Sequence, residues 1–173
     1  MTMPTVHANA VLVGAEGVLI RGRPGSGKSA LTRALVAAAM AEDRFARLVA
    51  DDRVVLTACH GRLIARPPAA LAGLAERRGR GIEATEHEGA AVVRLVVDLV
   101  APAEAERMPA PEALATEILG VALPRQPVAC GAPEAAGLVL AALAAAVASR
   151  AADQPAMATA PLFACAKGEP SQS

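Results

Sequence analysis

Short apolar runs separated by turn residues dominate the first two thirds of the chain. Short β-type runs at 11–14 and 18–21 flank Ala15-Glu16-Gly17, a pattern that predicts a β-hairpin. A second hairpin is expected from 54–57 and 62–65, which flank Cys59-His60-Gly61. Further strands are predicted at 47–50, 91–99, 118–123 and 127–129.

Helical spacing of apolar residues occurs in two longer segments. We expect one helix at 29–40 and a second at 133–150, which ends on a cation where the helix dipole favours one. One or two helical turns are expected at 68–75, because Pro is well tolerated at a helix start. The charged, Gly-rich segment 76–82 predicts a loop instead.

Length and composition fit one domain over 1–150 followed by a flexible tail over 151–173. The chain has 173 residues and no net charge, so it lacks the excess of cations typical of nucleic-acid-binding proteins. The apolar stretch 135–148 is shorter than the about 20 residues that a bilayer span needs. No signal peptide is evident, and three cysteines without metal-ligand spacing suit a reducing compartment. We therefore expect a cytoplasmic protein with no nucleic-acid or membrane partner.

The clearest chemical motif lies between the first hairpin and the first helix. It matches the pattern Gly-x-x-x-x-Gly-Lys-Ser/Thr, whose glycines let backbone N–H groups surround a polyphosphate at a helix N-terminus. Lys28, one of only two lysines in the chain, would contact the β- and γ-phosphates, and Ser29 would offer its hydroxyl to Mg²⁺. The expected phosphate-binding residues are Gly22, Arg23, Pro24, Gly25, Ser26, Gly27, Lys28 and Ser29.

Two carboxylates end the next predicted strand, where α/β sheets place their ligands. One of Asp51 and Asp52 could hold Mg²⁺, and one could take a proton from an attacking hydroxyl group. Adjacent residues of a strand point to opposite faces, so the two carboxylates should have different roles. Periodicity alone leaves open which of them is the base.

The order of these motifs resembles the catalytic domain of HPr kinase/phosphorylase. His7 precedes the first hairpin, the hairpin leads into the P-loop, and Leu48-Val49-Ala50-Asp51-Asp52 is similar to the hydrophobic-Ala-Asp-Asp element of that family. Residues 76–82, Glu-Arg-Arg-Gly-Arg-Gly-Ile, resemble the family signature Glu-x-Arg-Gly-x-Gly-Ile. The chain looks like the short, α-proteobacterial form. The resemblance implies an α/β fold: a P-loop-containing mixed β-sheet domain with flanking helices, similar to HPr kinase and PEP carboxykinase.

The resemblance also implies a function: an ATP- and Mg²⁺-dependent serine protein kinase acting on an HPr-like phosphocarrier of the phosphotransferase system. Such kinases are usually hexameric. By analogy Asp52 would be the general base, Lys28 would bind phosphate, and Ser29 and Glu76 would coordinate Mg²⁺. His7 and Arg107 would complete the site. The predicted catalytic residues are therefore Asp52, Asp51, His7, Lys28 and Arg107.

Three further functions stay open. Many family members also remove the phosphate with inorganic phosphate, but the loop that long members use for this has no clear counterpart at 123–133. A small-molecule P-loop kinase would use the same phosphate motif with a larger helical lid. A non-catalytic nucleotide sensor that controls a signalling partner would need no Asp52.

Overall fold

The computed structural model describes residues 5–77 and 79–153. Its strands are β1 (Thr5–Val6), β2 (Ala8–Val13), β3 (Glu16–Gly22), β4 (Ala46–Ala50), β5 (Val54–Cys59), β6 (Arg62–Arg66), β7 (Leu74–Arg77), β8 (Gly81–Ala84), β9 (Ala91–Val100), β10 (Ala115–Ile118) and β11 (Val121–Ala129). Its α-helices are α1 (Lys28–Ala41) and α2 (Ala135–Asp153), and 3₁₀ turns lie at Ala69–Leu71, Pro102–Glu104 and Pro111–Leu114.

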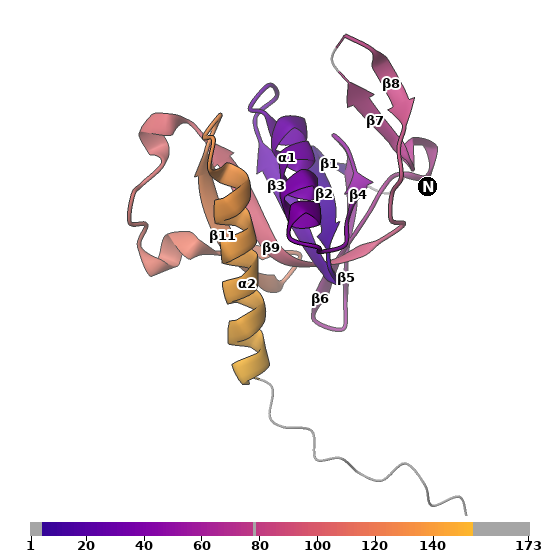
Figure 1. Ribbon diagram of the computed structural model, residues 1–173. Coiled ribbons are helices and arrows are strands. Elements are labelled where there is room, and N and C mark those ends of the chain that lie inside the picture. The colour runs from indigo at the N-terminus through magenta and orange to yellow at the C-terminus, as the bar shows by residue number, and fades with distance from the viewer. Residues whose placement is uncertain (1–4, 78, 154–173) are drawn as a thin grey trace, which may run out of the picture.

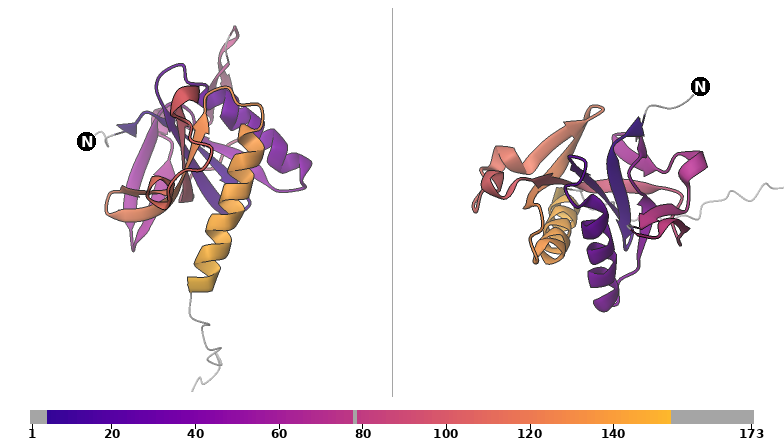
Figure 2. Two further views of the ribbon diagram at one scale, coloured as in Figure 1. Left: turned by 90° about the vertical axis from the view of Figure 1, so that its left-hand side faces the viewer. Right: turned by 90° about the horizontal axis from the view of Figure 1, so that it is seen from above.

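Nine of the strands form one mixed sheet around β9 (Figure 1). The main path runs β1-β5-β6-β9-β3-β2-β4, and β11 also pairs with β9 and carries β10. Because β3, β9 and β11 run parallel, their carboxyl ends meet at one end of the sheet, where β3 leads into the Gly-rich loop. Seen from above, α1 and α2 lie on the same side of the sheet (Figure 2).

Two apolar layers cover the two faces of this sheet. On the helix side, Ile20 and Val97 of the sheet pack with Leu35 of α1 and Leu143 of α2. On the other side, Leu19 and Val96 belong to a layer completed by residues of β5, β6 and β11. Successive residues of β3 therefore enter different layers, as the period-two geometry of a strand requires. Burial on both faces explains why β9 is almost continuously aliphatic.

The predicted α/β fold with a mixed sheet and flanking helices is confirmed. The two expected hairpins are β2–β3 and β5–β6, and the helix expected at 29–40 is α1. The helical turn expected at 68–75 is a 3₁₀ turn at Ala69–Leu71, directly after Pro68. The structure adds β2 residues before position 11, so the strand starts next to His7.

The prediction of a loop at 76–82 is wrong, because this segment belongs to the β7–β8 hairpin. Gly79 and Gly81 have φ values of +79° and +88°, which supply the left-handed residues that a short hairpin turn needs. Arg77 and Arg80 each lie 3.2 Å from a carboxylate oxygen of Glu83. The charges that suggested a solvated loop therefore pair with one another across the hairpin.

The strand expected at 118–123 is also wrong, since a hairpin turn divides it. Leu119 and Gly120 have φ values of +51° and +74°, and they connect β10 to β11. Two consecutive residues with positive φ are typical of a type I′ turn. The turn is not predicted from the sequence because Leu119 occupies its first position, where Asn, Asp or Gly is usual. The strand expected at 127–129 is the last part of β11.

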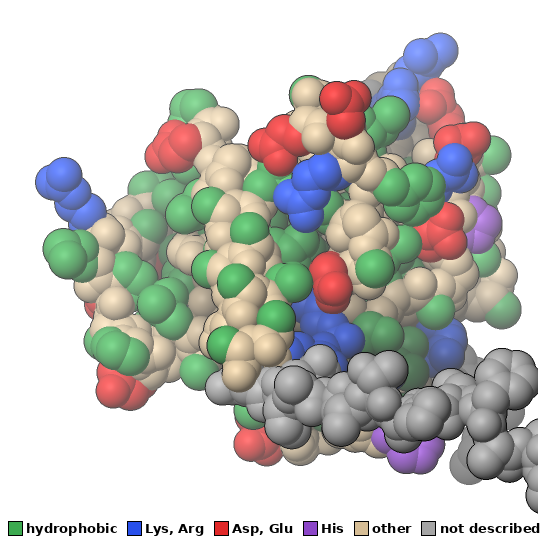
Figure 3. Space-filling model, turned by 60° about the horizontal axis from the view of Figure 1, so that its bottom comes forward, with side chains coloured by type: hydrophobic (Ala, Val, Ile, Leu, Met, Phe, Trp, Pro, Cys, Tyr) green, Lys and Arg blue, Asp and Glu red, His purple; other side chains and the backbone are tan. Residues whose placement is uncertain are grey.

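Helix α2 is longer and more exposed than the core helix that its apolar stretch suggested. It continues to Asp153, past the boundary expected at residue 150, and residues 154–173 lie outside the described part of the chain. By length and composition alone, Ala135–Ala152 could span a membrane, which is weak evidence because core helices pass the same test. Val139, Leu140 and Leu143 pack into the core, whereas only 22% of the segment is buried. Hydrophobic side chains and bare backbone show on its surface (Figure 3).

An ion-pair network joins the three parallel strands below the phosphate loop. Asp98 of β9 accepts hydrogen bonds from Arg21 Nε and Nη2 (2.7 and 2.8 Å) and from Arg125 Nε (2.5 Å). Arg125 also donates to the carbonyl oxygen of Ala113. Burial alone would raise the pKa of Asp98, but the two guanidinium groups outweigh it and hold this pKa below its ordinary value. The network ties β3 to β9 and β11 directly before Gly22.

Asp98→Asn should lower the free energy of unfolding by about 2 kcal/mol at pH 7, because two arginines lose their shared carboxylate. The folded pKa of Asp98 is lowered, so its contribution is complete above the ordinary pKa of about 3.9 and is lost as the pH falls through the folded value. The difference between wild type and variant should therefore shrink in acid. Urea unfolding at several pH values measures it.

Glu117→Gln provides the control, since Glu117 is exposed on β10 and has no ion pair within the described residues. Its effect should stay within about 0.5 kcal/mol at every pH. Equal stabilities of Asp98→Asn and wild type at pH 7 would show that the network does not hold the strands.

Candidate active site

Residues 22–29 form a tight loop between β3 and α1. Gly25 and Gly27 have φ values of +76° and +96°, a left-handed conformation that residues with a Cβ rarely adopt. A Cβ atom on Gly22 would lie 2.5 Å from Ser26 Oγ and 3.0 Å from Leu99 Cβ. Because α1 begins directly after Gly27, the loop and the N-terminal end of this helix form one cradle.

Lys28 lies almost buried in this cradle, with only 6% of its surface exposed. Its Nζ donates to the carbonyl oxygens of Gly22 (3.2 Å) and Arg23 (3.4 Å). In the described part of the chain it forms no ion pair with a carboxylate. A buried ammonium group held only by neutral oxygens is available to an anion.

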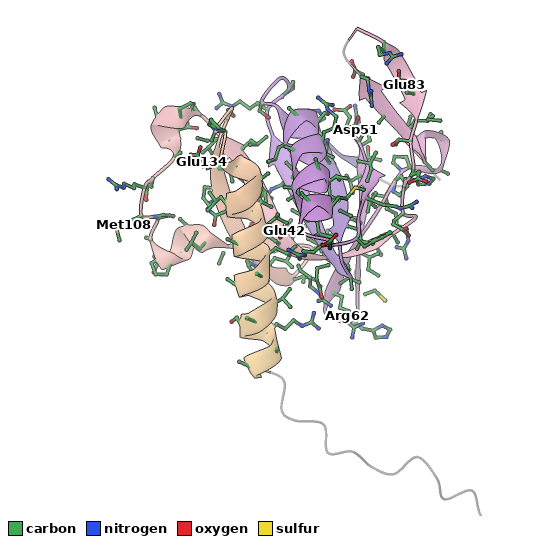
Figure 4. All side chains as sticks on the ribbon, viewed as in Figure 1. Glu42, Asp51, Arg62, Glu83, Met108 and Glu134 are labelled. Carbon is green, nitrogen blue, oxygen red and sulfur yellow. The ribbon has the colours of Figure 1, made fainter. Side chains whose placement is uncertain are left out.

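Asp51 collects hydrogen bonds from three separate elements. Its Oδ1 accepts from Ser29 Oγ of α1 (2.9 Å) and from Asn9 Nδ2 of β2 (2.7 Å), and its Oδ2 accepts from the backbone N–H of Glu76 in β7 (3.0 Å). Figure 4 shows Asp51 beside the N-terminal end of α1, below the β7–β8 hairpin that carries Glu83. The carboxylate is therefore fixed in place beside the P-loop hydroxyl.

Asp52 points elsewhere because its backbone turns sharply. The N–H of Arg53 donates to the carbonyl oxygen of Asp51 (2.8 Å), and Asp52 between them has a φ of +63°, the arrangement of a γ-turn. Its Oδ1 lies 2.5 Å from His7 Nε2, and 59% of its side chain is exposed. The structure thus brings His7, Lys28, Ser29, Asp51 and Asp52 to one end of the sheet.

Glu76 contacts this cluster through its backbone, whereas Arg107 makes no polar contact with its described residues. Glu76 reaches Asp51 with its backbone N–H, while its side chain is exposed. Arg107 is exposed and makes no hydrogen bond or ion pair to the described residues of the cluster. Its neighbour Met108 lies on the far side of α1 from Asp51 (Figure 4). A role for Arg107 in the site therefore stays a prediction, and Arg78 of the family signature lies outside the described residues.

A cavity of about 640 Å³ extends from this cluster along α1. At one end it is lined by Ser29, Asp51 and Glu76, and at the other by Met40 and Phe45. The β7–β8 hairpin forms its outer wall, since Arg77 and Glu83 also line it. Asp51 and Glu76 therefore stand at the edge of a volume large enough for a substrate segment, whereas Asp52 does not line it.

The groups present fit a polyphosphate and a hard divalent cation. Ser26 Oγ is buried without a hydrogen-bond partner in the described residues. Its hydroxyl could donate a hydrogen bond to a bound anion, which Lys28 and the positive end of α1 would also attract. The Ser29 hydroxyl and the Asp51 carboxylate are oxygen ligands of the kind that Mg²⁺ prefers. Within the described residues no three His, Cys, Asp or Glu side chains form a metal cage. Mg²⁺ needs none, because phosphates and water complete its shell.

Sequence reasoning missed two polar residues of the site. Asn9 is fully buried and bonds to Asp51, and Thr32 is almost fully buried and accepts a hydrogen bond from Asn9 (3.0 Å). The only signal was an Asn inside the apolar run Ala-Asn-Ala-Val-Leu-Val. A single polar position in a buried strand indicates a partner, but it does not say which one.

The sequence matches the family described as "HPr Serine kinase C-terminal domain" over residues 2–159. No curated protein sequence matches the chain. The structure is similar to that of the Hpr(Ser) kinase/phosphatase from Coxiella burnetii, with a TM-score of 0.64 and 26% sequence identity. This similarity covers 86% of the present chain and 97% of the Coxiella chain.

A tight phosphate loop on a mixed sheet, with a pair of carboxylates beside it, defines a P-loop domain of the phosphoryl-transfer class. The match over nearly the whole chain places this protein within that class: it belongs to the HPr serine kinase family. It is therefore an enzyme, a kinase for serine. The family resemblance expected from the P-loop, the Ala-Asp-Asp element and the 76–82 signature is confirmed.

Gly22→Ala should lower the free energy of unfolding by about 1–3 kcal/mol, because its Cβ would press on Ser26 and Leu99. It should also weaken binding of inorganic pyrophosphate, since Ser26 belongs to the cradle. Urea unfolding and calorimetric titration measure the two effects. Gly89→Ala is the matched control, because a Cβ there meets nothing within 4 Å and no positive φ is required. An unchanged Gly22→Ala variant would contradict the tight closure of the loop.

Proposed function

We propose that this domain transfers the γ-phosphoryl group of ATP, with Mg²⁺, to a serine of an HPr-like phosphocarrier protein of the phosphotransferase system. The observation that carries the proposal is the position of the His7–Asp52 pair beside Ser29, Asp51 and the Lys28 cradle. The family and the Coxiella structure support the coarser function, HPr serine kinase activity. The nucleotide, the metal ion and the residue roles are our extension.

The different surroundings of the two carboxylates support Asp52 as the general base. Asp51 already accepts three hydrogen bonds and lies against the Ser29 hydroxyl, so it is suited to hold Mg²⁺ with Ser29. Asp52 is more exposed, and its Oδ1 faces His7. An exposed carboxylate with one cationic or hydrogen-bonding neighbour can receive a proton from a hydroxyl that arrives from solvent.

In the transfer, the serine Oγ–H proton passes to Asp52 as the Oγ–P bond forms and the bond to ADP breaks. Lys28 binds phosphate oxygens and stabilises the charge that spreads over them. Bound Mg²⁺ supplies further charge neutralisation at the phosphates. We assign His7 to orienting Asp52, which it contacts. We assign Glu76 to the Mg²⁺ shell by family resemblance, and its backbone N–H donates to Asp51.

A protein substrate fits the open side of the site better than a small molecule. The alternative of a small-molecule kinase calls for a helical lid, but both α-helices of the described chain pack on one sheet face. The exposure of Asp52 and the cavity beside Asp51 leave room for a folded partner. We therefore assign the acceptor serine to a protein.

We also propose a homo-oligomer, a hexamer by family resemblance. The exposed apolar surface of α2 supports burial against other copies of the chain, since Leu138 and Val147 are each more than a third exposed. Light scattering after size-exclusion chromatography measures the number of chains. We further propose that the protein is cytoplasmic and has no nucleic-acid partner. The reverse reaction, with inorganic phosphate as acceptor, is tested by assaying pyrophosphate.

The decisive experiment incubates the protein with ATP, Mg²⁺ and the HPr-like protein of the same genome, and detects phosphoserine by mass spectrometry. Asp52→Asn should slow transfer by about a hundredfold or more, because the hydroxyl loses its proton acceptor. Binding of ATP to this variant should stay close to wild type, whereas Lys28→Ala should bind ATP much more weakly. ATP affinity is measured by calorimetry.

Glu117→Gln is the matched control for this test. Glu117 is an exposed carboxylate of β10 that does not line the cavity, and the substitution likewise exchanges a carboxylate for an amide. Its transfer rate should equal that of wild type. Transfer that survives Asp52→Asn would refute the base assignment, and ATP binding without any transfer would favour a nucleotide sensor.

A further inference from the structure

The Asn9 side chain stands between the two carboxylates of the site. It is fully buried near the start of β2, two residues after His7. Its Nδ2 donates to Asp51 Oδ1 (2.7 Å) and to Thr32 Oγ1 (3.0 Å), and it lies 3.4 Å from Ser29 Oγ. Its Oδ1 accepts the backbone N–H of Asp52 (3.0 Å). One amide group therefore contacts both aspartates and the P-loop serine.

The two ends of this amide have opposite tasks. The NH₂ end holds the Asp51 carboxylate against Ser29, on the side where the phosphate cradle lies. The carbonyl end holds the backbone N–H of Asp52, which keeps the γ-turn whose central residue has a φ of +63°. That turn directs the Asp52 side chain to His7 and away from Asp51. A carboxylate at position 9 could not donate, and an alanine could do neither.

We propose that Asn9 is a positioning residue that separates the roles of the two aspartates. It orients Asp51 with Ser29 for the metal ion and orients Asp52 with His7 for the proton. The inference rests on the proposed function, in which Asp51 and Ser29 hold Mg²⁺. Asn9 is fully buried and does not line the cavity, so it acts through these neighbours.

The test measures how strongly Mg²⁺ tightens ATP binding, as the ratio of the Kd for ATP in EDTA to the Kd in Mg²⁺. Asn9→Ala should reduce this ratio about tenfold, the usual loss when a group that orients a metal ligand is removed. The Kd for metal-free ATP should change less than twofold, because Lys28 and the loop are untouched. Ser29→Ala serves as the positive control and should lose the same ratio.

Asn9→Asp tests whether the hydrogen-bond donor of Asn9, rather than the volume of its side chain, orients Asp51. It keeps the volume of the side chain but replaces the donor with a carboxylate 2.7 Å from Asp51 Oδ1. We expect it to reduce the ratio at least as much as Asn9→Ala does. If Asn9→Ala does not fold, Asn9→Asp decides the question alone.

Leu143→Ala is the control for a merely structural role. Leu143 is a fully buried core residue of α2 that contacts neither aspartate by a hydrogen bond and does not line the cavity. The variant should lower the melting temperature but leave the Mg²⁺ ratio within twofold of wild type. An unchanged ratio in folded Asn9→Ala, or an equal loss in Leu143→Ala, would overturn the proposal.

The binding ratio does not require phosphoryl transfer. If wild type binds ATP more tightly with Mg²⁺ but phosphorylates no HPr-like protein, the proposed function fails while the ratio still decides the role of Asn9. If transfer is observed, kcat should fall in Asn9→Ala while the KM for the protein substrate changes little, because the positioned groups act on the reacting atoms.

Discussion

One carboxylate, Asp51, joins three parts of the chain that are far apart in sequence. A side chain from β2, a hydroxyl from α1 and a backbone N–H from β7 all donate to it. These contacts connect the P-loop helix to β2 and to the hairpin of the family signature. The cavity reaches the phosphate cradle at Ser29, which Asp51 contacts directly.

The sheet supplies the rigid base on which these groups are placed. β3 ends at Gly22 and is held to β9 and β11 by the Arg21–Asp98–Arg125 network directly beforehand. The strand that carries the phosphate loop is thus fixed by charge on one face and by aliphatic packing on the other. A loop with left-handed glycines has little stability of its own, so its geometry depends on both ends being anchored.

The parts of the site that depend on local backbone chemistry could be predicted from sequence. The P-loop, the start of α1 and the Asp51–Asp52 pair are short patterns whose geometry follows from glycine, helix dipole and strand end. The β7–β8 hairpin could not, because the charges of Arg77, Arg80 and Glu83 resemble a solvated loop in the sequence and pair with one another only in the folded hairpin. Asn9 could not either, since its partners lie 20 to 43 positions away in the chain. Such contacts exist only once the fold has formed.

The γ-turn at Asp52 restricts which residues this position can hold. A left-handed conformation costs most side chains about 1–2 kcal/mol, and Asn and Asp are the residues other than glycine that tolerate it best. Alanine at this position would therefore remove the carboxylate and strain the backbone together. The proposed role as a base and the backbone conformation constrain position 52 independently, and aspartate suits both.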